Sequence, residues 1–345
     1  MTNAAVRTPV VVSLKELVQG IDHATLAEAF GPQSLGIIVI KDLPQKFHDL
    51  RLKVLKSISI LANLGPDVLS NLESEEAMWL TGWSCGKEIL ANSGKPDFNK
   101  GSYYVNCAFH KNPEWEGPTE KLTKEFINHR AYTTANMWPS ADHKGLENFQ
   151  EDAKELISLI IDVAQSVAAN CDKFITESKI SPNYEQNYLE RIVKNSTCTK
   201  ARLLHYFPSK SSSESGKDDD WCGEHLDHSC LTGLTSALFI DESKGLTAAL
   251  DKSPDPESGL YIRDRQNEVV KVNIPPECLA FQTGSTLQEV SRGKFSAVPH
   301  YVKGTSIPNI ARNTLAVFCQ PDLDEMVNDS ENFAQYADRI LKANH

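Results

Sequence analysis

Residues 295–319 read FSAVPHYVKGTSIPNIARNTLAVFC and contain two β-strand patterns. Apolar, β-branched and aromatic residues gather at 296–302 and again at 314–319, and turn-forming Gly, Ser, Pro and Asn lie between them. Such runs predict two strands joined by a loop. The first predicted strand carries His300, and Arg312 lies at the start of the second. The pair therefore combines strand structure with side chains suited to chemistry.

Further short strand patterns precede this stretch, back to residue 202. Turns and loops separate them, and this spacing is typical of a sandwich or barrel, including jelly-roll and cupin types. The eight predicted strands are 202–207, 221–226, 233–239, 260–262, 268–272, 278–282, 296–302 and 314–319. Two polar segments, 209–220 and 241–259, predict loops.

The first half of the chain alternates strand and helix patterns. Strands are predicted at 10–12 and 36–40, and irregular or edge structure at 81–116. Apolar residues at helical spacing predict helices at 14–30, 45–64, 144–175 and 326–341. The predicted fold class is therefore α+β. A mixed α/β region spans 1–135, and a helix with a β-rich core spans 136–345, packed together as one unit.

Composition excludes several classes of protein. The 345 residues are 40% hydrophobic and 23% charged, a balance typical of globular proteins. The net charge of −11 repels nucleic-acid phosphates and anionic lipids, so we expect neither a nucleic-acid nor a membrane partner. No signal peptide or transmembrane pattern is evident. Eight cysteines lie scattered without a CxxC motif, which predicts reduced thiols and a cytoplasmic protein.

Three residues in the β-rich half suggest a metal site. His225 and Asp227 are two positions apart, a spacing that places both side chains on one face of a strand. This pair is weak by itself, but His300 from a distant predicted strand completes two imidazoles and one carboxylate. Such a triad leaves three positions open on an octahedral metal and suits the Fe(II) of oxygenases. His228 points away from Asp227 and is not a predicted ligand.

A carboxylate-binding pair follows the triad. Arg312 and Thr314 share one face of the last predicted strand. A guanidinium beside a hydroxyl is well suited to bind a carboxylate. The order of triad and clamp along the chain is more specific than either feature alone.

With these residues in place, most of the chain resembles the isopenicillin N synthase-like branch of the 2-oxoglutarate and Fe(II)-dependent oxygenases. The resemblance rests on five segments. They are GIIVIKDLP at 36–44, similar to "GFF-V-NHG"; NMWP at 136–139, similar to "N-WP"; RLLHYFP at 202–208, similar to "R-NYYP"; GSTLQEVSRGKFSAVPHYV at 284–302, similar to "GD-LQ--SNGK--S--HRV"; and RNTLAVF at 312–318, similar to "R-S--FF".

The resemblance implies a double-stranded β-helix, or jelly roll, with flanking helices. It implies a dioxygenase that uses Fe(II), 2-oxoglutarate and O₂ to hydroxylate, desaturate or cyclise a small organic metabolite. His225, Asp227 and His300 would bind the iron, and Arg312 with Thr314 would hold the distal carboxylate of 2-oxoglutarate. The sequence does not indicate the substrate, the pathway, the reaction outcome or the oligomeric state.

One departure bears on the cosubstrate. Phe207 stands where the family has its second tyrosine, and His205 where it has asparagine. Tyr206 and His205 are therefore included among the predicted cosubstrate-binding residues. Two alternatives stay open, namely an iron oxidase of the same fold that uses no 2-oxoglutarate, and a catalytically silent jelly-roll binding protein.

Overall fold

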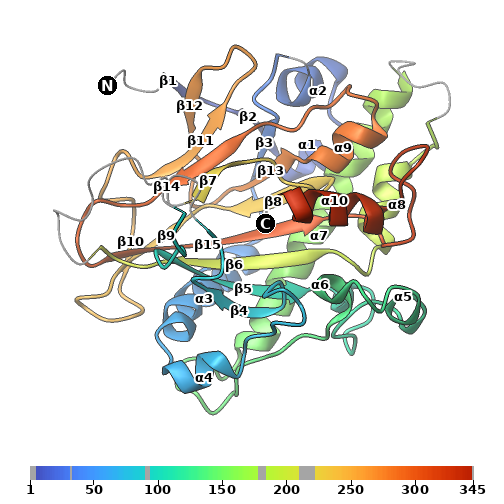
Figure 1. The fold of residues 1–345 in the computed structure, drawn as a ribbon. Helices are drawn as coiled ribbons and strands as arrows, with labels where there is room; N and C mark the ends of the chain where they lie inside the picture. The colour runs from blue at the N-terminus through green and yellow to red at the C-terminus, as the bar shows by residue number, and fades with distance from the viewer. Residues whose placement is uncertain (1–4, 32, 90–93, 178–183, 210–221, 344–345) are drawn as a thin grey trace.

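Two β-sheets face each other, and helices cover the outer face of the larger one (Figure 1). The structure, a computed structural model, describes residues 5–31, 33–89, 94–177, 184–209 and 222–343. The smaller sheet has the order β1 (Ala5–Arg7), β12 (Val269–Val272), β11 (Gly259–Arg263), β14 (His300–Lys303) and β7 (Cys222–His225).

The larger sheet joins strands from both halves of the chain. Its order is β2 (Val10–Ser13), β3 (Ile37–Lys41), β13 (Leu279–Thr283), β8 (Leu231–Thr235), β15 (Ile310–Cys319), β6 (Lys200–Tyr206), β5 (Lys100–Asn106) and β4 (Gly82–Cys85). β9 (Leu238–Asp241) pairs with β15 and with β10 (Ala249–Leu250). The predicted regions 1–135 and 136–345 thus share one sheet, and the predicted α+β jelly roll is confirmed.

Apolar side chains fill one end of the space between the sheets. Ile37, Val39 and Ala280 of the larger sheet pack with Leu260 and Ile262 of the smaller sheet. All five are buried. This packing fixes the distance between the sheets and leaves the other end for a cavity.

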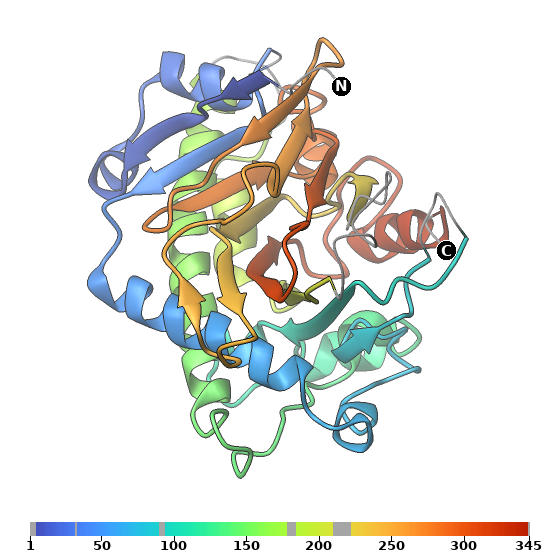
Figure 2. The ribbon, with the colours of Figure 1, turned by 90° about the vertical axis from the view of Figure 1, so that its left-hand side faces the viewer.

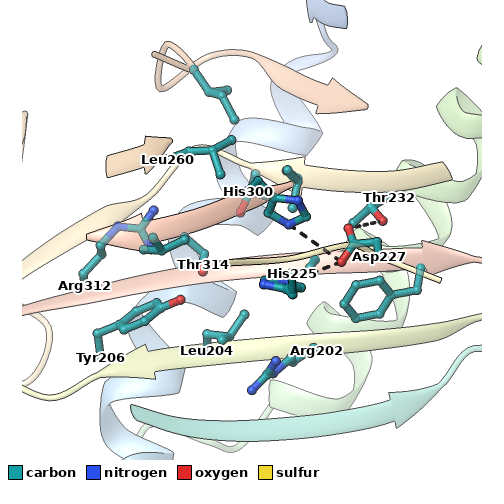
Figure 3. Close-up of a pocket in the computed structure, with 16 residues that line it drawn as sticks. Arg202, Leu204, Tyr206, His225, Asp227, Thr232, Leu260, His300, Arg312 and Thr314 are labelled. Atoms are coloured by element: carbon teal, nitrogen blue, oxygen red, sulfur yellow. Dashed lines mark hydrogen bonds and ion pairs between the residues drawn. The ribbon is translucent and has the colours of Figure 1, made fainter. Parts of the chain in front are cut away.

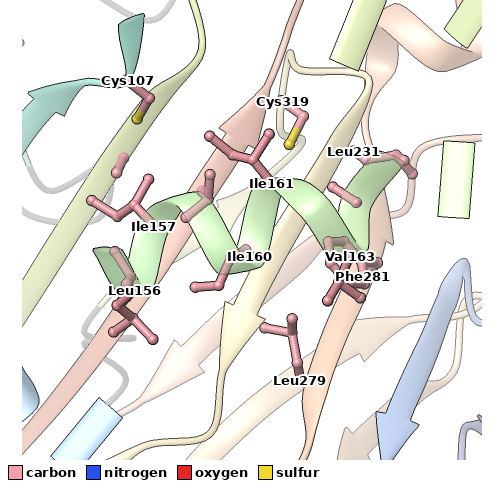
Figure 4. Packing of buried hydrophobic residues seen from close by; sticks show 14 of the residues in the cluster. Cys107, Leu156, Ile157, Ile160, Ile161, Val163, Leu231, Leu279, Phe281 and Cys319 are labelled. Atoms are coloured by element: carbon pink, nitrogen blue, oxygen red, sulfur yellow. The ribbon is translucent and has the colours of Figure 1, made fainter. Parts of the chain in front are cut away.

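Helices α1 (Leu14–Gln19), α2 (His23–Phe30), α3 (Gln45–Ala62) and α7 (Phe149–Glu177) form a layer on the outer face of the larger sheet. The longest helix, α7 (Phe149–Glu177), buries Leu156, Ile157 and Ile160 in a cluster that includes Leu231 and Phe281 of the sheet (Figure 4). Figure 2 gives the perpendicular view of the helix and the sheet. None of the described helices is both long and apolar enough to cross a membrane. Apart from α7, the described helices are α1 (Leu14–Gln19), α2 (His23–Phe30), α3 (Gln45–Ala62), α4 (Pro66–Ser70), η1 (Ala108–His110), α5 (Glu120–Glu125), α6 (Arg130–Thr133), α8 (Tyr188–Asn195), α9 (Ser285–Val290) and α10 (Phe333–Ala343).

The contact between α7 and β8 requires glycine at position 233. A Cβ atom there would lie 2.6 Å from Cγ2 of Ile160. We therefore expect Gly233→Ala to lower the free energy of unfolding by about 1–3 kcal/mol, as overpacking does in a well-packed core. Urea unfolding measures the loss. Gly65→Ala is the control, because no atom lies within 4 Å of its added Cβ, and an equal loss in both variants would contradict the explanation.

Two predicted strands differ from the structure. The predicted strand 233–239 is wrong as a single element, because β8 ends at Thr235 and β9 begins at Leu238. The Arg51 side chain of α3 donates hydrogen bonds to the carbonyl oxygens of Ser236 and Ala237. These bonds occupy the carbonyl groups at the break between the two strands.

The predicted strand 296–302 begins late, since β14 starts at His300. Pro299 directly before it has no N–H to donate to a neighbouring strand. The predicted helix 14–30 is two helices, because Gly20 ends α1 at a φ of 102° and the Asp22 side chain caps the start of α2. Most of the predicted loop 209–220 lies outside the described residues.

Candidate active site

A cavity of about 620 Å³, counting the part open to solvent, lies between the two sheets. Its walls include β6, β8 and β15 of the larger sheet and β7, β11 and β14 of the smaller sheet. Each predicted metal ligand lines it, as do Arg312, Thr314 and Tyr206 (Figure 3).

The three predicted metal ligands come together on the smaller sheet. His225 ends β7 and His300 begins β14, and the two residues are direct partners across these antiparallel strands. Asp227 lies two residues beyond His225, after the strand has ended. The pair therefore does not share a strand face as predicted, and the turn after β7 brings the carboxylate beside both imidazoles instead.

The donor atoms of the triad fit a divalent metal. Oδ1 of Asp227 lies 3.6 Å from Nε2 of His225 and 3.8 Å from Nε2 of His300. All three ligand atoms are within 4.8 Å of one another. Adjacent ligands of an octahedral ion, at about 2.1 Å each, are about 3 Å apart. A small inward movement of the side chains would thus complete three neighbouring coordination positions.

Hydrogen bonds orient two of the ligands. Oγ1 of Thr232 donates to Oδ2 of Asp227 at 2.6 Å, so Oδ1 is the oxygen that faces the histidines. Nδ1 of His225 lies 2.7 Å from the carbonyl oxygen of Gly223. A proton on Nδ1 satisfies this carbonyl and leaves the lone pair on Nε2, the atom nearest the carboxylate.

The charges of the triad also favour a cation. Burial alone would raise the pKa of Asp227, but His300, His225 and the Thr232 hydrogen bond lower it below its usual range. Burial, with the nearby His225, lowers the pKa of His300 to about 4. At neutral pH the site therefore holds a carboxylate and a neutral His300, the protonation states that metal binding requires.

The predicted carboxylate clamp lies on the larger sheet, across the cavity from the triad. Arg312 and Thr314 alternate along β15, so both face the cavity. Tyr206 of β6 is the direct partner of Arg312, whose guanidinium carbon lies 5.1 Å from the tyrosine ring. Arg312 is only 6% exposed, so a carboxylate bound there would be largely shielded from water.

The structure does not bring His205 to the cavity. Its side chain is fully buried on the opposite face of β6, where Nδ1 lies 2.8 Å from Oδ1 of Asn313. Arg202, Leu204 and Tyr206 face the cavity instead. Tyr206 thus presents a hydroxyl-bearing ring on the cavity face of β6. The tyrosine that Phe207 replaces is therefore not the only source of a hydroxyl group on this strand.

Sequence reasoning missed several polar residues at the site. Gln282 interrupts the apolar strand LAFQT of β13 and is fully buried, a signal that was visible in the sequence. Thr232 carried no signal, because threonine is common in strands. Arg202 also lines the cavity and forms an ion pair with Glu88. Burial alone would raise the pKa of Glu88, but Arg202 and Lys100 hold it at about 2, so this ion pair persists at neutral pH.

The sequence matches no family model and no curated protein. Solved structures do match. A full-length Neurospora crassa protein in complex with alpha-KG and thymine has a TM-score of 0.65 at 17% identity, over 100% of this chain and 99% of that one. JOX2 in complex with 2OG, Fe and JA has a TM-score of 0.63 at 14% identity, over 93% and 77%.

The dioxygenase for auxin oxidation from rice has a TM-score of 0.61 at 15% identity, over 98% of this chain and 96% of that one. The matches span both the jelly-roll strands and the N-terminal region, so the likeness is to the whole architecture. The chain therefore has the fold of the 2-oxoglutarate and Fe(II)-dependent oxygenases.

Proposed function

We propose that the chain is a 2-oxoglutarate- and Fe(II)-dependent dioxygenase that oxidises a small organic molecule. The observation that carries this proposal is the cavity in which His225, Asp227 and His300 face Arg312 and Thr314. A metal-binding triad by itself would suit many metalloproteins. A buried arginine across the same cavity adds a site for the carboxylate of a metal-bound cosubstrate.

Each residue has a role that its surroundings support. His225, Asp227 and His300 would hold the ferrous ion, which when bound supplies the capacity to activate O₂. Arg312 would pair with the distal carboxylate of 2-oxoglutarate, and the hydroxyl groups of Thr314 and Tyr206 could donate further hydrogen bonds to it. The apolar side chains of the cavity walls would exclude water from the reacting groups.

The cavity supports a small substrate. Apolar side chains such as Leu204, Leu234 and Ala316 line the cavity beside a few polar groups, as is typical of small-molecule sites. The Neurospora crassa protein and JOX2, which share the fold, hold thymine and JA in their complexes. Arg202, whose guanidinium pairs with Glu88, adds a polar group to the cavity wall, away from Arg312. Hydroxylation, desaturation and cyclisation all remain compatible with this site.

An anaerobic absorbance titration tests the proposal. Apo-protein receives Fe(II) first and 2-oxoglutarate second, and we expect a visible charge-transfer band only when both are present. Iron binding without the band would contradict the assignment of 2-oxoglutarate as cosubstrate and favour the oxidase that does not use it. Absence of iron binding would contradict the assignment of the chain as an iron-dependent enzyme and favour the catalytically silent binding protein.

We also propose a reducing compartment, the cytoplasm, as the location. The cysteine side chains that the structure describes are free thiols, and all of them except Cys85 are buried. Buried thiols without disulfide partners are typical of intracellular proteins.

A further inference from the structure

The amide of Gln282 lies directly behind the metal ligand His300. Gln282 belongs to β13 of the larger sheet and is fully buried. Its Nε2 atom lies 2.8 Å from Nδ1 of His300. Its Oε1 atom is also buried, and within the described part of the chain this oxygen has no hydrogen-bond partner. The amide nitrogen of Gln282 thus contacts the metal ligand His300, while the amide oxygen has no hydrogen-bond partner among the described residues.

The other two metal ligands, His225 and Asp227, are oriented by groups whose role as hydrogen-bond acceptor or donor is fixed. The Gly223 carbonyl facing His225 can only accept, and the Thr232 hydroxyl donates to Asp227. The Gln282 amide differs, because a half-turn about its last side-chain bond exchanges a donor for an acceptor at the same place. Its orientation therefore depends on where His300 carries its proton.

Metal binding decides the position of that proton. A metal on Nε2 of His300 uses the lone pair there, so Nδ1 must carry the hydrogen. An amide N–H group 2.8 Å from Nδ1 would then set two donors against each other. The carbonyl oxygen of Val298, 3.2 Å from Nδ1, is the only other acceptor for this hydrogen within the described residues. A half-turn of the Gln282 amide removes the conflict.

We propose that Gln282 is a positioning residue for the metal site, whose amide oxygen accepts a hydrogen bond from Nδ1–H of His300 when the metal is bound. This inference rests on the proposed function, because it requires that His300 binds the metal. The hydrogen bond holds the imidazole in the tautomer that presents Nε2 to the metal and fixes the direction of the ring. Loss of such a bond to a metal-bound histidine typically weakens metal binding 10- to 100-fold.

Gln282→Met tests the inference, since methionine has a similar length and cannot accept strongly. We expect its affinity for Mn(II), measured by anaerobic isothermal titration, to fall about 10- to 100-fold. Gln320→Met is the matched control, because Gln320 is buried but donates to the carbonyl of Cys198, away from the cavity. The control should bind Mn(II) like the wild type.

Gln282→Glu distinguishes the two amide orientations. A carboxylate accepts from Nδ1–H, so this variant should bind Mn(II) at least as tightly as the wild type. Affinity as weak as that of Gln282→Met would show that the amide N–H is required and would overturn the inference. Wild-type affinity in a folded Gln282→Met variant would overturn it as well.

A measurement on the wild type covers the case in which the methionine variant does not fold. In Zn(II)-loaded protein with ¹⁵N-labelled histidine, we expect His300 to carry its hydrogen on Nδ1 and to exchange it slowly with water. A proton on Nε2, or fast exchange at Nδ1, would contradict the inference. If the wild type bound neither metal, the metal site itself would be wrong, a result distinct from binding that is indifferent to Gln282.

Discussion

Asp227→Ala should abolish Fe(II) binding while the fold persists. Asp227 is the only anionic member of the triad, and the two remaining imidazoles bring no charge to offset the dehydration of a divalent ion. We expect the affinity for Fe(II) to fall by more than about 100-fold, beyond the 10- to 100-fold effect of residues that only support a ligand. Anaerobic isothermal titration measures this loss.

The fold should tolerate the change because the carboxylate has few structural partners. Its hydrogen-bond donor Thr232 keeps a second partner, since Oγ of Ser229 lies 3.0 Å from Oγ1 of Thr232. Circular dichroism and thermal unfolding should therefore resemble those of the wild-type apo-protein. Asp255→Ala is the control, because Asp255 is also buried but accepts from the backbone N–H of Ser306, outside the cavity. Unchanged Fe(II) affinity in Asp227→Ala would refute the ligand assignment.

The sequence was sufficient for the architecture because the relevant patterns are local. Short strands with turns between them, and the apolar spacing of α7, follow from the periodicity of side chains along each element. One failure has a local cause and the other a tertiary one. Pro299 removed a hydrogen-bond donor from the start of β14, and Arg51 bound the carbonyl groups between β8 and β9.

The site was only partly predictable because its parts meet across sheets. His205 was expected at the cosubstrate, but a shift of one residue along a strand turns every side chain to the other face. In the structure it is Tyr206 that faces the cavity. The partners of the ligands could not be found by spacing, since Gln282 reaches His300 from the opposite sheet.

The metal ligands and the predicted carboxylate clamp lie on different sheets, so the effect of a change at Arg312 on 2-oxoglutarate binding can be separated from the effect of a change at Asp227 on Fe(II) binding. The metal ligands belong to β7, β14 and the turn after β7, whereas Arg312, Thr314 and Tyr206 belong to the larger sheet. A change at Arg312 therefore leaves the triad and its hydrogen bonds in place. A substitution of Arg312 should therefore change cosubstrate binding without changing metal binding.

Arg312→Ala should weaken 2-oxoglutarate binding strongly and leave Fe(II) binding unchanged. Loss of one partner of a buried charge pair costs about 2–5 kcal/mol, and each 1.4 kcal/mol is tenfold in affinity. We therefore expect the dissociation constant of 2-oxoglutarate to rise between about 30-fold and several thousand-fold. Titration of the visible charge-transfer band with 2-oxoglutarate, at saturating Fe(II) without oxygen, measures it.

Two further variants show whether geometry or charge carries the effect. Arg312→Lys keeps the positive charge but loses the planar fork that binds a carboxylate through two hydrogen bonds, so its affinity should lie between those of Arg312→Ala and the wild type. Arg339→Ala is the control, because its guanidinium pairs with Glu331 on the exposed surface near α10. If Arg312→Ala bound 2-oxoglutarate like the control, the carboxylate would bind elsewhere, and the larger sheet would face the substrate rather than the cosubstrate.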